Sequence, residues 1–274
     1  MLAFSKFSGS GNDFIIVDNR EGAFEWLNLP APELVRRLCR RRFSVGADGL
    51  ILIEQDPEVD FAWRFFNADG SEVEMCGNGG RCAARFAHLK GIAGPRMAFR
   101  TVAGVMRAEV LGERVKLEVG RPRDIALDFE LSVNGEMLRA DSLNTGVPHV
   151  VVAVGDLEGC DVTGLGRAIR YHERFAPAGT NANFVRVAGG AVHIRTYERG
   201  VEDETLACGT GSIAAALVAA LKGQAASPVE VHTRGGETLR IHFSREGGGF
   251  RDVFLEGGAA YVYEGRLQPG AFIS

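Results

Sequence analysis

Two short segments of the chain place a cysteine at the start of a glycine-rich stretch that runs into an alanine-rich pattern. The first is Cys76-Gly77-Asn78-Gly79, and the second is Cys208-Gly209-Thr210-Gly211. Each segment is followed, at the same distance, by Leu-Lys-Gly. This matched spacing indicates a duplicated fold that supplies one thiol from each half.

A cysteine at the beginning of a helix has distinctive chemistry. The first turn exposes backbone N–H groups without partners, and the helix dipole favours negative charge there. A thiol in this position can have a pKa of roughly 3.5–7.5 instead of about 8.5. The same N–H groups bind carboxylates. Each Cys-Gly segment is therefore predicted to offer a base together with an anion-binding site.

Two such sites on opposite sides of one substrate would invert a stereocentre. A substrate carboxylate would lie between the two helix ends, one thiolate would remove the α-proton, and the other thiol would protonate the opposite face. A reversible inversion needs two bases of similar strength, and the pair Cys76 and Cys208 meets that requirement. Cys39, Cys82 and Cys160 lack such a matched glycine frame, and we interpret them as structural.

The cysteine segments belong to a repeat that covers most of the chain. It predicts an α/β (α+β) fold of two similar lobes with the active site in the cleft between them. The first lobe is expected to comprise residues 1–119 completed by 264–274, and the second residues 120–263. The other matched segments are Gly11–Phe14 with Gly146–His149, Leu34–Arg42 with Asp161–His172, Asp48-Gly49 with Ala182-Asn183, and Glu72 with Glu204.

The overall composition narrows the class of protein. Apolar residues make up 46% of the chain and charged residues 24%, which is typical of a globular protein. A net charge of -4 gives no reason to expect nucleic acid or a membrane as a partner. We expect a cytoplasmic protein with free thiols, because five cysteines occur without an export signal or a membrane-spanning apolar run. The chain has no C-x-x-C pair or histidine cluster, so no metal site is predicted.

Several further motifs resemble the signature series of the diaminopimelate epimerase family. The similarity extends from end to end and keeps the order of the motifs. They are Gly11-Asn12-Asp13-Phe14, Phe66-Asn67-Ala68-Asp69-Gly70, Met75-Cys76-Gly77-Asn78-Gly79, Gly179-Thr180-Asn181, Tyr197-Glu198-Arg199-Gly200 and Glu204-Thr205-Leu206-Ala207-Cys208-Gly209-Thr210-Gly211.

The resemblance implies a cofactor-independent epimerase that converts L,L-diaminopimelate to the meso form, for lysine and peptidoglycan precursor synthesis. It also implies a homodimer of chains with two pseudo-symmetric lobes, each a curled mixed sheet around a central helix. Cys76 and Cys208 would be the acid and base, and His149 and Glu198 would flank the thiols and set their protonation. The reacting carboxylate would bind the backbone of Gly77, Asn78, Gly209 and Thr210. The remaining substrate contacts would come from Asn12, Asn67, Asn181, Glu198 and Arg199.

Two positions depart from the family pattern. Some members have Asn where this chain has Val147, and some have Gln where it has Gly49. Neither residue can donate a side-chain hydrogen bond, so recognition of the distal end of the substrate would depend more on the other polar side chains.

Two alternatives remain open. The first is a related racemase or isomerase of the same fold that acts on histidine, hydroxyproline or an unsaturated acid. The second is a non-catalytic amino-acid-binding protein, which would need the anion-binding helix ends but not the thiols. The presence of both cysteines argues against related members that replace one of them, and Arg199 and the several Asn residues fit a substrate with a second polar end.

Overall fold

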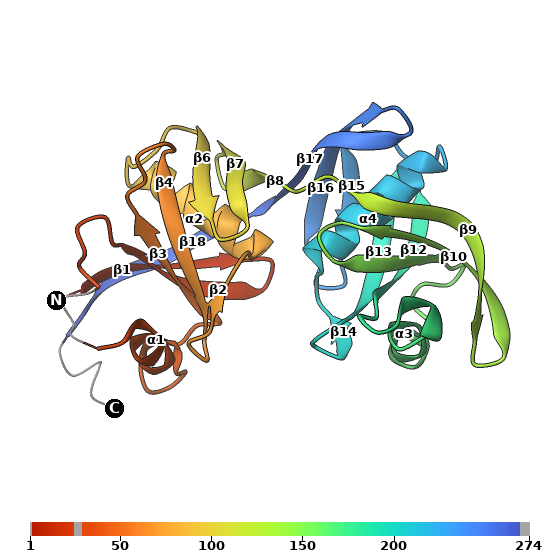
Figure 1. Ribbon diagram of the computed structural model, residues 1–274, viewed down its shortest axis with the longest axis horizontal. Coiled ribbons are helices and arrows are strands. Elements are labelled where there is room, and N and C mark those ends of the chain that lie inside the picture. Colours follow the sequence, from red (N-terminus) through yellow and green to blue (C-terminus); the bar gives the residue numbers. More distant parts are fainter. Residues whose placement is uncertain (1, 25–28, 269–274) are drawn as a thin grey trace. The chain divides into compact units, whose positions relative to one another are not determined.

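The computed structural model describes residues 2–24 and 29–268. The chain divides into two compact units, Met1–Leu117 with Gly257–Ser274 (unit 1) and Glu118–Glu256 (unit 2). It leaves unit 1 at the end of β8 (Arg114–Glu118) and returns within β17 (Gly249–Gly258). Unit 2 is therefore inserted into unit 1 (Figure 1). Residues 269–274, which were predicted to complete the first lobe, lie outside the described residues.

Unit 1 is a mixed sheet whose strands pair in the order β18–β1–β2–β3–β4–β6–β7–β8, with the short β5 also on β4. The pairs β2/β3 and β4/β6 are parallel, and the others are antiparallel. The elements are β1 (Leu2–Gly9), β2 (Asn12–Asp18), α1 (Ala31–Cys39), β3 (Gly49–Glu54), β4 (Phe61–Asn67), β5 (Glu72–Val73), α2 (Gly77–Leu89), β6 (Arg96–Thr101), β7 (Gly104–Leu111) and β18 (Ala260–Leu267).

Unit 2 repeats this arrangement in the order β9–β10–β11–β12–β13–β15–β16–β17, with β14 also on β13. Its parallel pairs, β11/β12 and β13/β15, fall at the equivalent places. This match confirms the prediction of two similar α/β units. The elements are β9 (Arg123–Val133), β10 (Glu136–Asn144), β11 (Pro148–Ala153), α3 (Val162–Arg170), the 3-10 helix η2 (Glu173–Phe175), β12 (Asn181–Ala188), β13 (Ala191–Glu198), β14 (Asp203–Thr205), α4 (Gly209–Leu221), β15 (Val229–His232) and β16 (Thr238–Glu246).

The last strand, β18, takes the place in unit 1 that β9 takes in unit 2. It pairs with β1 from Leu2 opposite Leu267 to Ser8 opposite Ala260. Residues 260–263 therefore lie in unit 1, and the chain returns earlier than the expected position 264. Buried Arg81 and Arg85 of α2 donate to the backbone carbonyls of Gly258 and Ala259, so the returning segment also satisfies two charged groups in the core.

Both faces of each sheet are covered, which explains the continuous apolar runs in the central strands. In unit 1, one face packs on the central helix α2 and the other on α1 (Figure 1). In unit 2, α4 and α3 cover the two faces in the same way. Alternate residues of one strand therefore enter different cores: Phe14, Ile16, Ile51 and Ile53 pack with α2, whereas Ile15, Val17, Leu50 and Leu52 pack with α1.

Strand register corrects one part of the sequence overlay. Phe14 stands opposite Gly49 in the parallel pair β2/β3, and His149 stands opposite Asn181 in β11/β12. Because Phe14 and His149 occupy equivalent positions, Gly49 is equivalent to Asn181. The predicted match of Asp48-Gly49 with Ala182-Asn183 is therefore wrong by two residues, since hydrogen-bond register and not ungapped spacing fixes which residues correspond.

No helix among residues 2–24 and 29–268 is long and apolar enough to cross a membrane.

Gly49 provides a test of the packing beneath β3. A Cβ atom at this position would lie 2.5 Å from Cε2 of Phe65 and 2.6 Å from the carbonyl oxygen of Phe66. We expect Gly49→Ala to lower the free energy of unfolding by roughly 1–3 kcal/mol, as overpacking does in other cores. Urea denaturation measures the change. The control is Gly94→Ala, where the nearest atom is 3.8 Å away; equal stability of the two variants would contradict the prediction.

Candidate active site

The central helix of unit 1 begins immediately after Cys76. Cys76 is its N-cap in an extended conformation, and its Sγ accepts a hydrogen bond from the backbone N–H of Gly79 at 3.4 Å. Gly77 is exposed and Asn78 is half-buried, whereas the helix is fully buried from Gly79 to Ala87. The first turn is therefore the open part of a helix that is otherwise enclosed, and it presents a half-buried thiol together with backbone N–H groups.

A chain of polar side chains orients Asn78. Its Nδ2 donates to Oδ1 of Asn12 at 2.8 Å, and Nδ2 of Asn12 donates to Oδ2 of Asp48 at 3.3 Å. Arg41 donates to the other oxygen of Asp48 at 2.9 Å. The structure thus brings Asn12 and Asn78 together, and it adds Asp48, which the sequence analysis named only as part of a matched segment. The sequence did offer one signal for Asp48, because this residue directly precedes a strand that runs parallel beside β2.

Asn67 ends β4 and is exposed. Its backbone N–H donates to the carbonyl of Ser71 at 2.9 Å, and its Nδ2 donates to Oγ of Ser71 at 3.3 Å. These bonds close the turn before the Cys76 segment. Within the part of the chain that the structure describes, Asn67 makes no hydrogen bond to another predicted site residue.

The central helix of unit 2 begins in the same way, after Cys208. The Cys208 side chain is more enclosed than that of Cys76, with 7% of the residue exposed. Its Sγ lies 3.5 Å from Oγ1 of Thr210, and Thr145 donates to the carbonyl of Thr210 at 3.1 Å. A Cβ at Gly211 would lie 2.3 Å from Oδ1 of Asn183. Glycine is required there because the third helical residue passes directly against a buried side chain.

Glu198 lies beside Cys208. It ends β13 and accepts a hydrogen bond from Oγ1 of Thr205 at 2.9 Å. Burial raises the pKa of Glu198, while hydrogen bonds from Thr205 and Cys208 act in the opposite direction. A carboxyl group therefore directly contacts the thiol of unit 2.

Three further predicted residues gather around the start of β11. His149 is 1% exposed, and burial lowers its pKa to about 3. Asn181 donates from Nδ2 to the carbonyl of Pro148 at 2.9 Å and accepts from the backbone N–H of Arg199 at 2.8 Å. The Arg199 side chain donates to the carbonyl of Ala178 at 3.1 Å. Unit 2 thus contains most of the predicted polar residues in one connected region.

Both thiols have pKa values above that of an ordinary cysteine, so the expectation of a lowered value is wrong. Burial raises the pKa of Cys76. Burial and the adjacent Glu198 carboxylate raise the pKa of Cys208 to about 12. Hydrogen bonds from the helix start act in the opposite direction but are the smaller effect. Neither thiol is substantially ionised at neutral pH in the ligand-free protein, because removal from water disfavours the thiolate.

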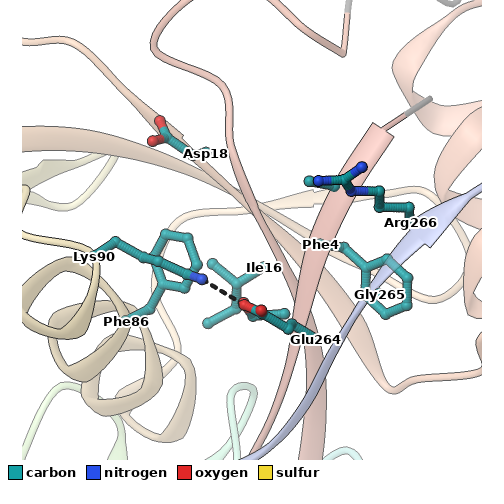
Figure 2. A pocket seen from close by; sticks show the side chains of 10 residues that line it. Phe4, Ile16, Asp18, Phe86, Lys90, Glu264, Gly265 and Arg266 are labelled. Carbon is teal, nitrogen blue, oxygen red and sulfur yellow. Dashed lines mark hydrogen bonds and ion pairs between the residues drawn. The ribbon is translucent and has the colours of Figure 1, made fainter.

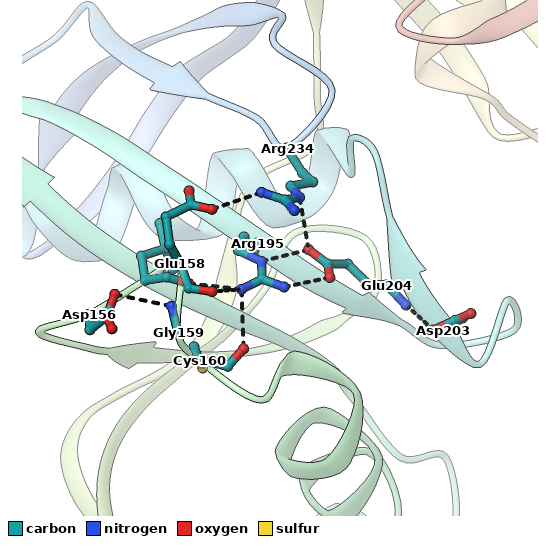
Figure 3. A network of polar contacts seen from close by, with 9 residues as sticks. Asp156, Glu158, Gly159, Cys160, Arg195, Asp203, Glu204 and Arg234 are labelled. Atoms are coloured by element: carbon teal, nitrogen blue, oxygen red, sulfur yellow. Dashed lines mark hydrogen bonds and ion pairs between the residues drawn. The ribbon is translucent and has the colours of Figure 1, made fainter.

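An ion pair anchors the strand that leads to Cys208 (Figure 3). Nε and Nη2 of Arg195 on β13 each donate to Glu204 on β14 at 2.7 Å. Nη1 of the same guanidinium donates to the carbonyls of Leu157, Glu158 and Cys160 at 2.9–3.1 Å. The equivalent pair in unit 1, Arg64 with Glu72 at 3.1 Å, holds β5 before Cys76. The bidentate pair in unit 2 and the single pair in unit 1 hold the short strands that precede Cys208 and Cys76.

A pocket of about 510 Å³ in unit 1 lies elsewhere (Figure 2). Phe4, Ile16 and Phe86 form its apolar wall, and Lys90 pairs with Glu264 across it at 2.6 Å. None of its lining residues belongs to the candidate active site.

Among the described residues, no group of three His, Cys, Asp or Glu side chains is arranged to hold a metal ion.

The fold and the paired Cys-capped helices define the class of protein. The structure resembles a PhzF-family phenazine biosynthesis protein from Bacillus anthracis, with a TM-score of 0.71 and 16% identity over 97% of this chain and 99% of the other. It also resembles a probable proline racemase from Agrobacterium radiobacter K84, with a TM-score of 0.65 and 16% identity over 98% and 93%. The chain thus has the two-unit fold shared by PhzF proteins and proline racemases.

The chain belongs to the diaminopimelate epimerase family. The family model "Diaminopimelate epimerase" matches residues 4–125 and 142–262. A diaminopimelate epimerase of Aquifex aeolicus is 49% identical and covers 97% of this chain and 98% of its own length. One from Archaeoglobus fulgidus is 41% identical, with 97% and 96% covered.

The difference in burial between the thiols predicts their reactivity. We expect iodoacetamide to modify Cys76 faster than Cys208 or Cys39, because Cys76 is half-buried while the others are 7% and 4% exposed. The thiolate is the reactive form. With pKa values of about 12 for Cys208 and Cys39, their modification rates should still be rising with pH well above neutrality. Peptide mass spectrometry at several pH values measures the rates; equal rates for Cys76 and Cys208 at neutral pH would contradict the assignment.

Proposed function

We propose that the protein interconverts L,L-diaminopimelate and meso-diaminopimelate by proton transfer at Cα, without a cofactor. The observation that carries the proposal is the occurrence of Cys-capped helix starts at equivalent positions of two units with the same strand order. The names of the relatives support the substrate, and the family membership supports an isomerase.

The two thiols act on opposite faces of one Cα. The backbone N–H groups of Gly77, Asn78, Gly209 and Thr210 hold the adjacent carboxylate, and the positive helix ends stabilise the negative charge that develops as the α-proton leaves. One thiolate takes the α-proton, and the other thiol gives its proton to the opposite face. No atom is gained or lost by the substrate apart from this exchange, and the two sulfurs finish with their protonation states reversed.

The two thiols have different surroundings. Burial, together with the adjacent Glu198 carboxylate, raises the pKa of Cys208 and so favours its thiol form. Cys76 is less enclosed, and no carboxylate among the described residues is in hydrogen-bond contact with it. Asn12, Asn67, Asn181, Glu198 and Arg199 contact the remainder of the substrate. We also propose that His149 takes part at this site.

We also propose that the protein works as a homodimer in the cytoplasm. Both statements rest on the resemblance to the family and on the biosynthetic role of diaminopimelate. Analytical ultracentrifugation of the purified chain measures the first, and fractionation of the source cells measures the second.

Loss of either thiol is expected to abolish turnover. Cys76→Ala and Cys208→Ala should each lower kcat for L,L-diaminopimelate by at least about 10²–10⁴-fold, the contribution of a positioned acid or base. The assay follows formation of the meso isomer without added pyridoxal phosphate. Circular dichroism verifies the fold, and Cys160→Ala, which alters a thiol outside both helix starts, should retain normal turnover.

The same assay distinguishes the proposal from its alternatives. Near-normal turnover in either helix-start variant would refute the two-base mechanism. Wild-type turnover of proline, histidine or hydroxyproline but not of diaminopimelate would identify a related racemase. Binding of diaminopimelate without any turnover would identify a binding protein.

Isotope incorporation tests whether two separate groups act. In D₂O, each diaminopimelate isomer is expected to give product that carries deuterium at Cα, because the incoming proton comes from a thiol that has exchanged with solvent. Mass spectrometry or proton NMR of the product at low conversion measures the label. Full retention of the original proton would indicate one shared base on a single face.

A further inference from the structure

The two units differ beneath their central helices. In unit 2, Asn183 on β12 stands opposite Thr196 on β13. In unit 1, the same register places Ile51 on β3 opposite Phe65 on β4. The third residue of the central helix lies above Ile51 in unit 1 and above Asn183 in unit 2. A Cβ at Gly79 would meet Ile51 at 3.3 Å, and a Cβ at Gly211 would meet Asn183 at 2.3 Å. Ile51 and Asn183 are therefore equivalent positions.

Three polar side chains in unit 2 replace three apolar ones in unit 1. Phe14, Ile51 and Phe65 belong to the core around α2, and the two phenylalanine rings make an edge contact with centroids 5.9 Å apart. Their counterparts are His149, Asn183 and Thr196, which are at most 3% exposed. A polar triad in so buried a place is costly unless every group is satisfied.

Hydrogen bonds fix the orientation of the Asn183 amide. One end of the amide lies 2.8 Å from the carbonyl oxygen of Val150, which can only accept, so this end is the NH₂ group. The other end, Oδ1, accepts from Oγ1 of Thr196 at 3.0 Å. The backbone of β11 therefore determines which way Asn183 points.

The same NH₂ group lies 3.1 Å from Nδ1 of His149. Because Asn183 donates there, Nδ1 must accept and carries no hydrogen. Burial keeps the ring neutral at physiological pH, since it lowers the pKa to about 3. The neutral ring then carries its one hydrogen on Nε2. That nitrogen is buried and has no hydrogen-bond partner within residues 2–24 and 29–268.

We propose that Asn183 is a positioning residue that holds His149 as the Nε2–H tautomer, so that His149 acts in the reaction as a hydrogen-bond donor and not as a base. The role in turnover rests on the proposed function; the tautomer does not. Protonation of the ring would place a second hydrogen on Nδ1, directly against the NH₂ group of Asn183. Abstraction of the α-proton is thereby reserved for the thiols, and the buried Nε2–H is available to an acceptor that enters with the substrate.

The test is the nitrogen NMR spectrum of His149 in the ligand-free protein. Chain labelled with ¹⁵N gives separate signals for bare and protonated ring nitrogens, and loss of one set of signals in His149→Gln assigns them. We expect a bare Nδ1 and a protonated Nε2 in the wild type at neutral pH. A protonated Nδ1, or a doubly protonated ring, would overturn the proposal whether or not the protein proves to be an epimerase.

A nearly isosteric change should reverse the tautomer. In Asn183→Asp a carboxylate oxygen replaces the NH₂ group, so we expect the hydrogen to move to Nδ1 and kcat to fall by about 10–100-fold, the range seen when a partner that orients a histidine is lost. If this variant does not fold, Asn183→Ala should give a mixture of tautomers. Retention of the pure Nε2–H form in either folded variant would overturn the role of Asn183.

The matched control changes the equivalent position of unit 1. Ile51→Val removes one methylene at a site of equal burial and is expected to leave the His149 signals and kcat unchanged. An equal loss of kcat in Ile51→Val and Asn183→Asp would mean that both act through packing, and it would overturn a specific role for Asn183 in turnover.

Discussion

Each unit is built around a helix that is buried everywhere except at its ends, and the first turn of that helix is left without backbone partners. This constraint determines much of the rest of the structure. Small side chains let the sheet pack closely against these helices, as at Ala83 and Ala84 of α2 and at Ala214–Ala216 of α4. The N–H groups of the first turn that have no partner in the helix can bind an anion.

The duplicated backbone does not make the two thiols equivalent. Cys208 is enclosed, contacts Glu198 and lies above a hydrogen-bonded polar triad, whereas Cys76 is half-buried above an apolar core. A reversible inversion needs two groups that can exchange roles, and two thiols in different surroundings would fill both roles. The two units share one backbone arrangement, and the side chains beneath the central helices make the surroundings of the two thiols different.

The sequence predicted the paired helix starts, the duplication and most of the candidate residues, because spacing and local pattern are sufficient for these. It did not predict the direction of the thiol pKa shifts, since the helix effect at Cys76 and Cys208 is local but the burial that exceeds it depends on the whole unit. Nor did it reveal Asn183 or Asp48, whose partners on neighbouring strands become visible only when the register is known. The same register moved the counterpart of Gly49 to Asn181.

The position of β18 has a consequence for synthesis of the chain. Unit 2 begins with the strand that unit 1 reaches last, so the two units are circular permutants of one strand order. Domains generally fold as they emerge from the ribosome. Unit 2 is continuous in sequence and can close while the end of the chain is still being made. Unit 1, although synthesised first, must keep one edge of β1 without its partner strand, and the arginines of α2 without the carbonyls of Gly258 and Ala259, until residues 258–267 appear. Unit 1, whose synthesis starts first, is therefore completed after unit 2.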